Sequence, residues 1–247
     1  MLNYKLLFME AESLRQQRER IKFSVCRHAP CDAVRQVFRE AEEELGKLSD
    51  ALVMLEQDGA APVLPDGKVG GNGAMLLSVG DSEHENGGDF VLVVSKSGKK
   101  PGERLGVDEF CVVDNFDSDS WSAHYSSSRD DYKPSSDTPL LWESLMEGQR
   151  KYSWRKSPRV ALHGHALADE ETAARLNIPI SSEETLFSTP EDVTALEGLF
   201  RENPYPEQKL FLRKNHGFFL LADSVTQAIE VYQRCILPHL NSQTINQ

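Results

Sequence analysis

The sequence predicts an α/β fold in which helices cover both sides of a mixed β-sheet. Three observations support this prediction. Residues 32–57 repeat apolar side chains at the three- and four-residue spacing of an amphipathic helix. Short apolar runs of the length of buried strands recur between residues 75 and 221. Segments with helix-start signals lie between the later runs.

The N-terminal part of the chain is expected to be helical. Residues 1–30 are expected to form a helical extension, and residues 31–247 the main domain. Asp32 can cap a long helix that ends at about Gln57. The apolar stripe of this helix is expected to pack against the domain's own sheet. A coiled-coil seam with a partner subunit is the less favoured alternative, because the stripe spans barely two to three heptads.

Strand patterns follow a loop that is rich in Pro and Gly. Apolar runs at residues 75–79 and 90–95 flank an acidic segment that contains glycine, and together they predict a β-hairpin. A third strand is expected at residues 110–114. The Ser- and Asp-rich residues 115–132 are expected to form an irregular surface segment.

Helices and strands alternate in the second half of the chain. Thr189 is a well-formed helix start, because Pro190 can occupy the first helical position and two acidic residues follow it. Strands are expected at residues 160–162, 210–212 and 218–221. Helices are expected at residues 139–152, 166–176, 190–202 and from 223 or 224 to about 238.

Charge and hydropathy exclude several classes of function. The 247 residues carry a net charge of −12, which argues against a nucleic-acid partner and an anionic membrane surface. No run approaches the eighteen or so apolar residues that a membrane span needs, and the N-terminus lacks a secretory cleavage pattern. Four cysteines lack the spacing of a metal site, so free thiols in a reducing cytoplasm are expected. They are Cys26, Cys31, Cys111 and Cys235.

Three histidines that adjoin predicted strands are candidate metal ligands. His163 and His165 follow the apolar residues 160–162, and side chains at positions i and i+2 of a strand point to the same face. His216 lies in an Asn-His-Gly sequence between two later apolar runs. A third imidazole at that junction could complete a three-histidine site with one open coordination position, as catalytic metal sites have. Taken alone, a His-x-His pair is more often not a metal site, and Asn-His-Gly is more often a turn.

The order of several motifs resembles that of the class II aldolase/adducin family. Gly71-Asn72, Ser97-Gly98, Pro-Ser-Ser-Asp at residues 134–137, the His-x-His pair and Asn-His-Gly occur in the family's order and approximate spacing. The resemblance covers roughly residues 70–235. It implies a three-layer α/β/α sandwich around a central mixed, mainly antiparallel sheet. It also implies a homotetramer with sites between subunits.

The resemblance also implies roles for individual residues. His163, His165 and His216 would hold a divalent metal ion, with Zn²⁺ preferred. Asp137 would be a further ligand or a proton shuttle, and capping of the following helix is the alternative. A substrate phosphate would be anchored by Asn72, Ser97, Gly98, Ser135 and Ser136, with positive charge added by Lys96, Lys99 and Lys100.

Two departures from the family pattern bear on the reaction. Asp137 stands where the family's aldolases commonly have Glu, and in this respect the chain is more similar to the family's ribulose-phosphate 4-epimerases. The tail also lacks a tyrosine that could serve as proton donor. Tyr205, Glu183 and Glu184 are possible replacements, although packing or surface roles are favoured for each.

The expected function is that of a metal-dependent lyase that acts on a small molecule. It would cleave a phosphorylated sugar or hydroxy-carbonyl compound by a retro-aldol reaction, through an enediolate that the ion stabilises. An epimerase or dehydratase of the same family is an alternative. A second alternative, from a different class, is a non-catalytic scaffold domain like that of the adducins.

Overall fold

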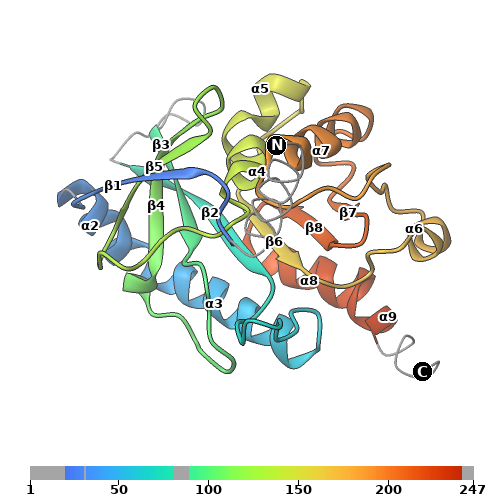
Figure 1. The fold of residues 1–247 in the computed structure, drawn as a ribbon, viewed down its shortest axis with the longest axis horizontal. Coiled ribbons are helices and arrows are strands. Elements are labelled where there is room, and N and C mark those ends of the chain that lie inside the picture. The colour runs from blue at the N-terminus through green and yellow to red at the C-terminus, as the bar shows by residue number, and fades with distance from the viewer. Residues whose placement is uncertain (1–19, 31, 80–88, 241–247) are drawn as a thin grey trace, which may run out of the picture.

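The computed structural model describes residues 20–30, 32–79 and 89–240, and its centre is an eight-stranded β-sheet (Figure 1). The strand order is β1-β5-β4-β3-β2-β6-β8-β7. Strand β1 is parallel to β5, and the other neighbouring pairs in this order are antiparallel. The mixed, mainly antiparallel sheet expected from the sequence is confirmed.

The strands are β1 (Ser24–His28), β2 (Asn72–Val79), β3 (Asp89–Ser95), β4 (Phe110–Asp117), β5 (Ser122–Ser127), β6 (Val160–Gly164), β7 (Leu210–Arg213) and β8 (Gly217–Ala222). The longer helices are α2 (Asp32–Glu40), α3 (Glu42–Gln57), α7 (Pro190–Glu202) and α8 (Val225–Cys235). The shorter ones are η1 (Val107–Glu109), α4 (Thr138–Trp142), η2 (Glu143–Glu147), α5 (Gly148–Tyr152), α6 (Glu170–Leu176) and α9 (Leu237–Leu240). Within the described residues, none of these helices combines the length and the apolar character that crossing a bilayer requires.

Two hydrophobic cores lie on opposite faces of the sheet, because successive side chains of a strand point to opposite sides. Val93 and Leu162 pack in the core that also contains the buried residues of α3 and α8. Val94 and Ala161, their neighbours in the chain, pack in the core that contains α4 and α7. Figure 1 shows these two pairs of helices on either side of the strands. The expected three-layer α/β/α sandwich is confirmed.

The single helix predicted over residues 32–57 is divided into α2 and α3 at Ala41, which has φ −98° and ψ 12°. Hydrogen bonds of the α-helical i to i−4 type continue across this point, because the Ala41 amide donates to Val37 and the Leu45 amide donates to Ala41. The break is therefore a local distortion rather than a loop. The buried face of α3 lies in the core against the sheet, which confirms the expected packing.

Two strands lie where the sequence predicted other structure. Strand β5 occupies part of the predicted irregular segment 115–132, and its buried residues include Ala123 and Tyr125. Strand β1 falls within the predicted helical extension, and residues 1–19 of that extension lie outside the described residues. Polar side chains fill most positions of both strands, so neither has the apolar alternation by which strands are recognised.

Helix boundaries in the second half follow the capping residues. Helix α7 begins at Pro190 as predicted, and the Ser224 side chain caps α8 by accepting from the Gln227 amide. The predicted helix at residues 166–176 begins only at Glu170, because Asp169 caps it. The helical segment at residues 138–152 contains a π-helical turn, η2.

Candidate metal centre

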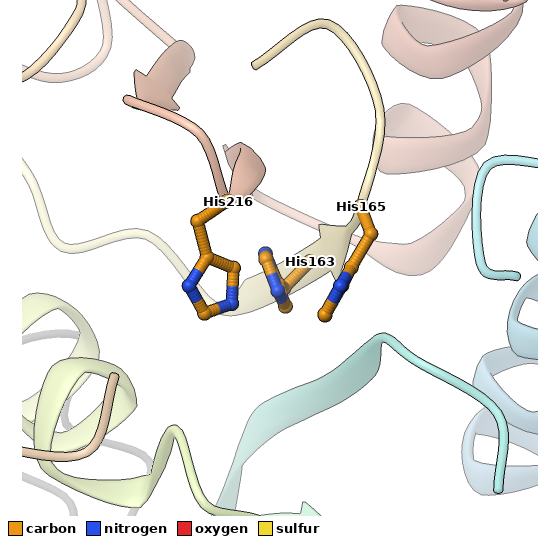
Figure 2. A group of neighbouring side chains, drawn as sticks. All are labelled: His163, His165 and His216. Atoms are coloured by element: carbon orange, nitrogen blue, oxygen red, sulfur yellow. The ribbon is translucent and has the colours of Figure 1, made fainter. Parts of the chain in front are cut away.

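The three histidines predicted as ligands converge at one end of the sheet (Figure 2). His163 lies in β6 between β2 and β8, and His165 follows directly after that strand. His216 lies in the turn between β7 and β8. The ring centroids are 4.8 to 4.9 Å apart, and one potential ligand nitrogen from each ring lies within 4.8 Å of the others.

A close approach of two backbone segments brings His216 to the other two rings. Gly217 has φ 148°, and a Cβ atom at this position would lie 2.0 Å from the Gly164 carbonyl oxygen. Only glycine allows this contact between the β7–β8 turn and the end of β6. The glycine of the Asn-His-Gly motif therefore has a specific structural purpose, which is to place His216 next to the His-x-His pair.

His163 is held in one tautomer by the backbone. Its Nδ1 atom lies 2.7 Å from the Phe218 carbonyl oxygen, which can only accept a hydrogen bond, so Nδ1 carries the proton. The lone pair is then on Nε2, which is buried and has no hydrogen-bond partner among the described residues. A carbonyl that fixes the second ring nitrogen is a common feature of metal-binding histidines.

Burial keeps all three imidazoles neutral at neutral pH. It lowers the pKa of His163 to about 3, with partial opposition from the Asp137 carboxylate. Burial likewise lowers the pKa of His165, and it lowers that of His216 to well below its ordinary value. Neutral imidazoles are the form that binds metals. Three of them, one with an unpartnered and buried nitrogen, fit a divalent cation.

Asp137 lies beside the histidines, and its carboxylate does not cap the following helix within the described structure. Its Oδ2 atom accepts a hydrogen bond of 2.8 Å from the Asn72 amide and lies 3.6 Å from His163 Nε2. Its Oδ1 atom lies 3.1 Å from Nη1 of Arg213. Burial is the largest single influence and disfavours the ionised form. The charge of Arg213, together with the nearby histidines and the hydrogen bond from Asn72, outweighs burial and holds the pKa of Asp137 well below its usual range. The capping alternative is therefore wrong, and Asp137 is a buried carboxylate at the histidine cluster.

Arg213 is a buried residue of the site that the sequence analysis did not single out. It is the last residue of β7 and is 2% exposed. Besides contacting Asp137, it contacts Asp192 through Nε and Nη2 at 3.2 and 2.5 Å. Burial raises the pKa of Asp192, and Arg213 opposes this shift. The sequence did contain an indication of its role, because an arginine at the end of a buried apolar strand needs buried acidic partners.

A cavity of about 550 Å³ joins the histidines to the predicted phosphate-binding residues. Its lining includes His165, His216, Asp137 and every residue predicted to anchor phosphate. Those anchoring residues are Asn72, Ser97, Gly98, Ser135 and Ser136. The motifs that are scattered over the sequence therefore form one continuous surface.

Most donors around this cavity already have partners. Lys96 is paired with Glu103 and Glu109, and Lys99 is paired with Glu56. The Ser97 amide donates to Lys133, and the Ser135 amide donates to Ser95. The hydroxyl groups of Ser97, Ser135 and Ser136 are therefore better placed than the lysines to bind an anion. The Asn72 amide nitrogen is likewise used, because it donates to Asp137.

The residues considered as proton donors lie elsewhere. Tyr205 is buried in the core on the α7 side and donates to Asp223 at 2.7 Å, and it is not among the residues that line the cavity. Glu184 accepts a hydrogen bond from the Asn215 side chain. Sequence reasoning missed Phe187, which lines the cavity with its ring centroid 5.6 Å from that of His216.

An ion pair at the cavity wall also escaped the sequence analysis. Arg20 and Asp66 both line the cavity, and Nη2 of Arg20 lies 2.9 Å from Oδ1 of Asp66. The arginine holds the pKa of Asp66 down to about 2. Arg20 lies within residues 1–30, which were expected to form a helical extension. Arg20 and Asp66 are 46 residues apart in the chain, so no sequence pattern indicated that they form an ion pair.

Solved structures of class II aldolases are similar to this structure. A sugar-phosphate aldolase from Thermotoga maritima is 15% identical, with a TM-score of 0.55 over 84% of this chain and 98% of that chain. An aldolase II superfamily protein from Pseudomonas syringae is 13% identical, with a TM-score of 0.54 over 86% of this chain and 81% of the other. An L-fuculose 1-phosphate aldolase from Glaciozyma antarctica PI12 is 10% identical, with a TM-score of 0.51 over 88% and 78%.

These similarities concern the fold. No protein-family model matches the sequence, and no curated protein matches it either. The chain has the class II aldolase fold that the order of its motifs predicted. Its chemistry has to be argued from the residues of its own site.

Proposed function

We propose that the protein is a metal-dependent lyase that cleaves a small hydroxy-carbonyl compound, such as a sugar phosphate, in a retro-aldol reaction. The observation that carries this proposal is the convergence of three neutral histidines and one carboxylate at a cavity that serine hydroxyls also line. Bound there, a divalent ion such as Zn²⁺ would supply a Lewis acid that polarises the substrate carbonyl and stabilises the negative charge that develops on its oxygen during carbon–carbon bond cleavage.

The chain's own residues divide the remaining work. His163, His165 and His216 would hold the ion, since each is neutral, His163 being buried and the other two partly buried. The pKa of Asp137 is lowered so far that its carboxylate is a weak base. This favours a ligand or electrostatic role for Asp137 over that of a proton shuttle.

The serine side chains would orient the substrate. Ser97, Ser135 and Ser136 would bind the phosphate through their hydroxyl groups, and Gly98, with φ 78°, allows the turn that follows Ser97. Asn72 would act indirectly, because its amide holds Asp137. Substrates without the anionic group should therefore bind less tightly while the chemistry at the other end is unchanged.

Two alternatives make different predictions. An epimerase or dehydratase would use the same ion, and the aspartate at position 137 favours it. Such an enzyme would convert a sugar phosphate into a product that keeps the whole carbon skeleton, whereas the lyase would release two smaller fragments. A scaffold domain would need no ion, so purified protein without affinity for Zn²⁺ would favour the scaffold.

The variant His163→Ala tests the proposal. We expect loss of metal binding and of turnover with the fold retained, because the fixed Nε2 lone pair is removed. Zinc content after dialysis, turnover on a panel of sugar phosphates and circular dichroism are the measurements. His124→Ala, which removes an exposed histidine, is the control and should leave all three unchanged. Unaltered zinc content and turnover in His163→Ala would rule this site out.

Two further features of the proposal rest on the sequence. They are a homotetramer with sites between subunits, which the family resemblance implies, and a cytoplasmic location, which the free cysteines suggest. Analytical ultracentrifugation of the full chain measures the first of these. A monomer that is fully active would contradict a site shared between subunits.

A further inference from the structure

We propose that Arg213 is a positioning residue that assigns the two oxygens of Asp137 to different tasks. One oxygen is tied to Arg213, and the other is thereby directed toward the position where the histidines would hold the ion. This inference rests on the proposed function, since it concerns the same metal centre. It adds a residue to the site, and with it the reason why an aspartate is suited to this position.

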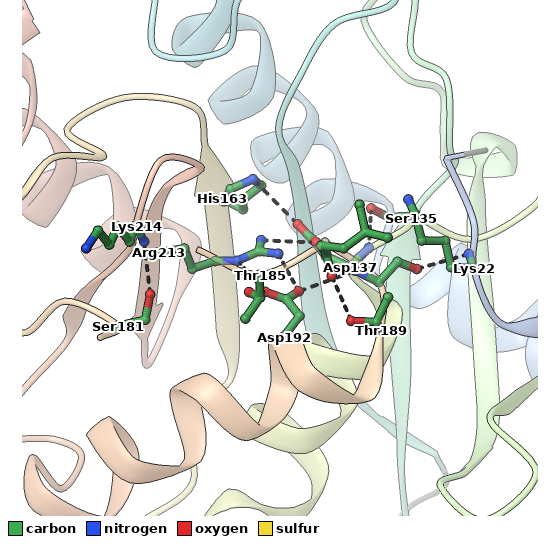
Figure 3. A network of polar contacts seen from close by, with 12 residues as sticks. Lys22, Ser135, Asp137, His163, Ser181, Thr185, Thr189, Asp192, Arg213 and Lys214 are labelled. Atoms are coloured by element: carbon green, nitrogen blue, oxygen red, sulfur yellow. Dashed lines mark hydrogen bonds and ion pairs between the residues drawn. The ribbon is translucent and has the colours of Figure 1, made fainter. Parts of the chain in front are cut away.

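The contacts of Asp137 support this assignment (Figure 3). Nη1 of Arg213 lies 3.1 Å from Oδ1. The other oxygen, Oδ2, is the one that lies 3.6 Å from His163 Nε2, and the Asn72 amide holds it there. Both oxygens of the carboxylate thus accept hydrogen bonds from planar groups, the Arg213 guanidinium and the Asn72 amide. Rotation that would turn Oδ1 toward the histidines is opposed by the loss of a buried ion pair.

Asp192 holds Arg213 in place from the opposite side. It binds the guanidinium through two contacts, at 3.2 and 2.5 Å. Its own oxygens also accept from the Thr185 hydroxyl at 3.0 Å and from the Ser188 amide at 3.3 Å. These bonds fix Asp192 at the start of α7 and at the loop before it. The guanidinium can satisfy both carboxylates because its donors form a rigid planar fork, which a lysine cannot reproduce.

The charges of this cluster give a test that separates positioning from simple electrostatics. Arg213 carries one positive charge and the two aspartates carry two negative charges, so the trio has a net charge of −1 beside three neutral histidines. If Arg213 acted only as a nearby charge, it would repel a divalent cation, and its removal would strengthen metal binding. If Arg213 positions Asp137, its removal weakens metal binding. The two roles therefore predict changes of opposite sign.

The experiment is a zinc competition titration against a chromophoric chelator at pH 7.5 with the full chain. We expect Arg213→Met to weaken zinc binding at least tenfold, in line with the loss of other groups that orient metal ligands. Arg213→Lys should recover part of the affinity, because it retains the charge and one contact. Asp137→Asn combined with Arg213→Met should bind zinc as weakly as Asp137→Asn alone, since both changes act through one carboxylate.

Lys151→Met is the matched control. Lys151 also bridges two carboxylates on the α7 side of the sheet, with its Nζ atom 2.8 Å from Glu143 and 2.6 Å from Glu197. Lys151 does not line the cavity, so the zinc affinity of Lys151→Met should equal that of the wild-type chain. The control therefore measures what the loss of a bridging cation does to zinc binding when the cation is away from Asp137.

Each outcome decides between the claims. Equal or tighter zinc binding by Arg213→Met would overturn the positioning role and leave the proposed function standing. Failure of the wild-type chain to bind zinc would overturn both. Should Arg213→Met fail to fold, Arg213→Lys decides, because the positioning role requires weaker binding in that variant and wild-type affinity would refute it.

Discussion

His163 owes its properties to two neighbours rather than to its place in a motif. The Phe218 carbonyl fixes the proton on Nδ1, and burial keeps the ring neutral. The sequence identified the residue because His-x-His after an apolar run is a recognisable pattern. It could not identify the carbonyl, which is 55 residues away in the chain and becomes a neighbour only when β6 pairs with β8.

Arg213 and Asp137 show the same difference between residue type and residue environment. Asp137 was found from its motif, yet its state depends on a guanidinium 76 residues distant. Arg213 had only a weak signal, which was a charge at the end of an apolar strand. Long-range ion pairs of this kind are set by tertiary packing, and a single sequence gives no spacing rule for them.

Buried neutral histidines should make the metal-free protein sensitive to mild acid. Below pH 6.5 the histidines of the unfolded chain take up protons, whereas folded His163 does so only near pH 3. The unfolded state then binds more protons, so the free energy of unfolding should fall as the pH falls from 6.5 toward 3. The expected slope is about 1.4 kcal/mol per pH unit for each such histidine.

Urea denaturation of the metal-free chain between pH 7.5 and pH 5.0 measures this slope. The variant His163→Leu should show a shallower dependence, lower by about 1.4 kcal/mol per pH unit in the part of the range below pH 6.5. Asp137 should add to the loss only below about pH 4, where the carboxylates of the unfolded chain become protonated and the folded one does not. Identical slopes for both proteins would contradict a neutral, buried His163.

At the level of elements, the turn between β7 and β8 sets the geometry of the site. Gly217 lets the turn touch the end of β6. Asn215, with φ 57°, occupies the left-handed region that Asn tolerates better than most residues. The sequence Asn-His-Gly was weighed as a turn against a ligand-bearing motif, and it is a turn that carries a candidate ligand.

Gly217→Ala should destabilise the protein and separate His216 from its partners. The added Cβ would meet the Gly164 carbonyl, and the backbone conformation is unfavourable for alanine. We expect the free energy of unfolding to drop by about 2–4 kcal/mol, from strain and overpacking together. Zinc affinity should fall as well, because the turn has to move away from β6.

Gly198→Ala is the matched control for this substitution. Gly198 lies inside α7, and a Cβ atom there would point into open space rather than against a neighbouring segment. Alanine in a helix interior should stabilise the protein by about 0.5–1 kcal/mol. Chemical denaturation and zinc titration of both variants give the comparison. Wild-type stability and affinity in Gly217→Ala would show that the turn does not hold His216.

Elements with strong apolar patterns were predicted well, and those without them were not. The hairpin of β2 and β3 and the strands β6, β7 and β8 lie where their apolar runs indicated. Strand β5 was missed because its partners, β4 and β1, supply the hydrogen bonds that define it. The break between α2 and α3 at Ala41 also had no signal, because alanine favours helix.

For the whole molecule, the fold was predictable because two independent lines agreed. Apolar periodicity indicated helices around a sheet, and the order of the motifs indicated a particular three-layer arrangement. The solved class II aldolases that are similar in fold share as little as 10% of their residues with this chain. What the sequence left open were the contacts between distant segments, which decide which oxygen or nitrogen faces the site.

Zinc should stabilise the whole chain through this one centre. At a free zinc concentration of one hundred times the dissociation constant, the expected gain is about 2.7 kcal/mol. For a chain of this size, that gain corresponds to a rise of roughly 5–10 °C in Tm. Differential scanning calorimetry with and without zinc measures it, and the shift should be lost in His165→Ala. An equal shift in that variant would place the bound zinc elsewhere.

The position of β1 has a practical consequence for shortened versions of the protein. The strand joins the edge of the sheet beside β5, while Arg20, a few residues before it, lines the cavity. Deleting residues 1–30 would therefore expose the backbone of β5 to self-association and remove Arg20 from the wall of the cavity. A shortened version of the protein should keep these residues, even though the motifs of the candidate site all begin some forty positions later.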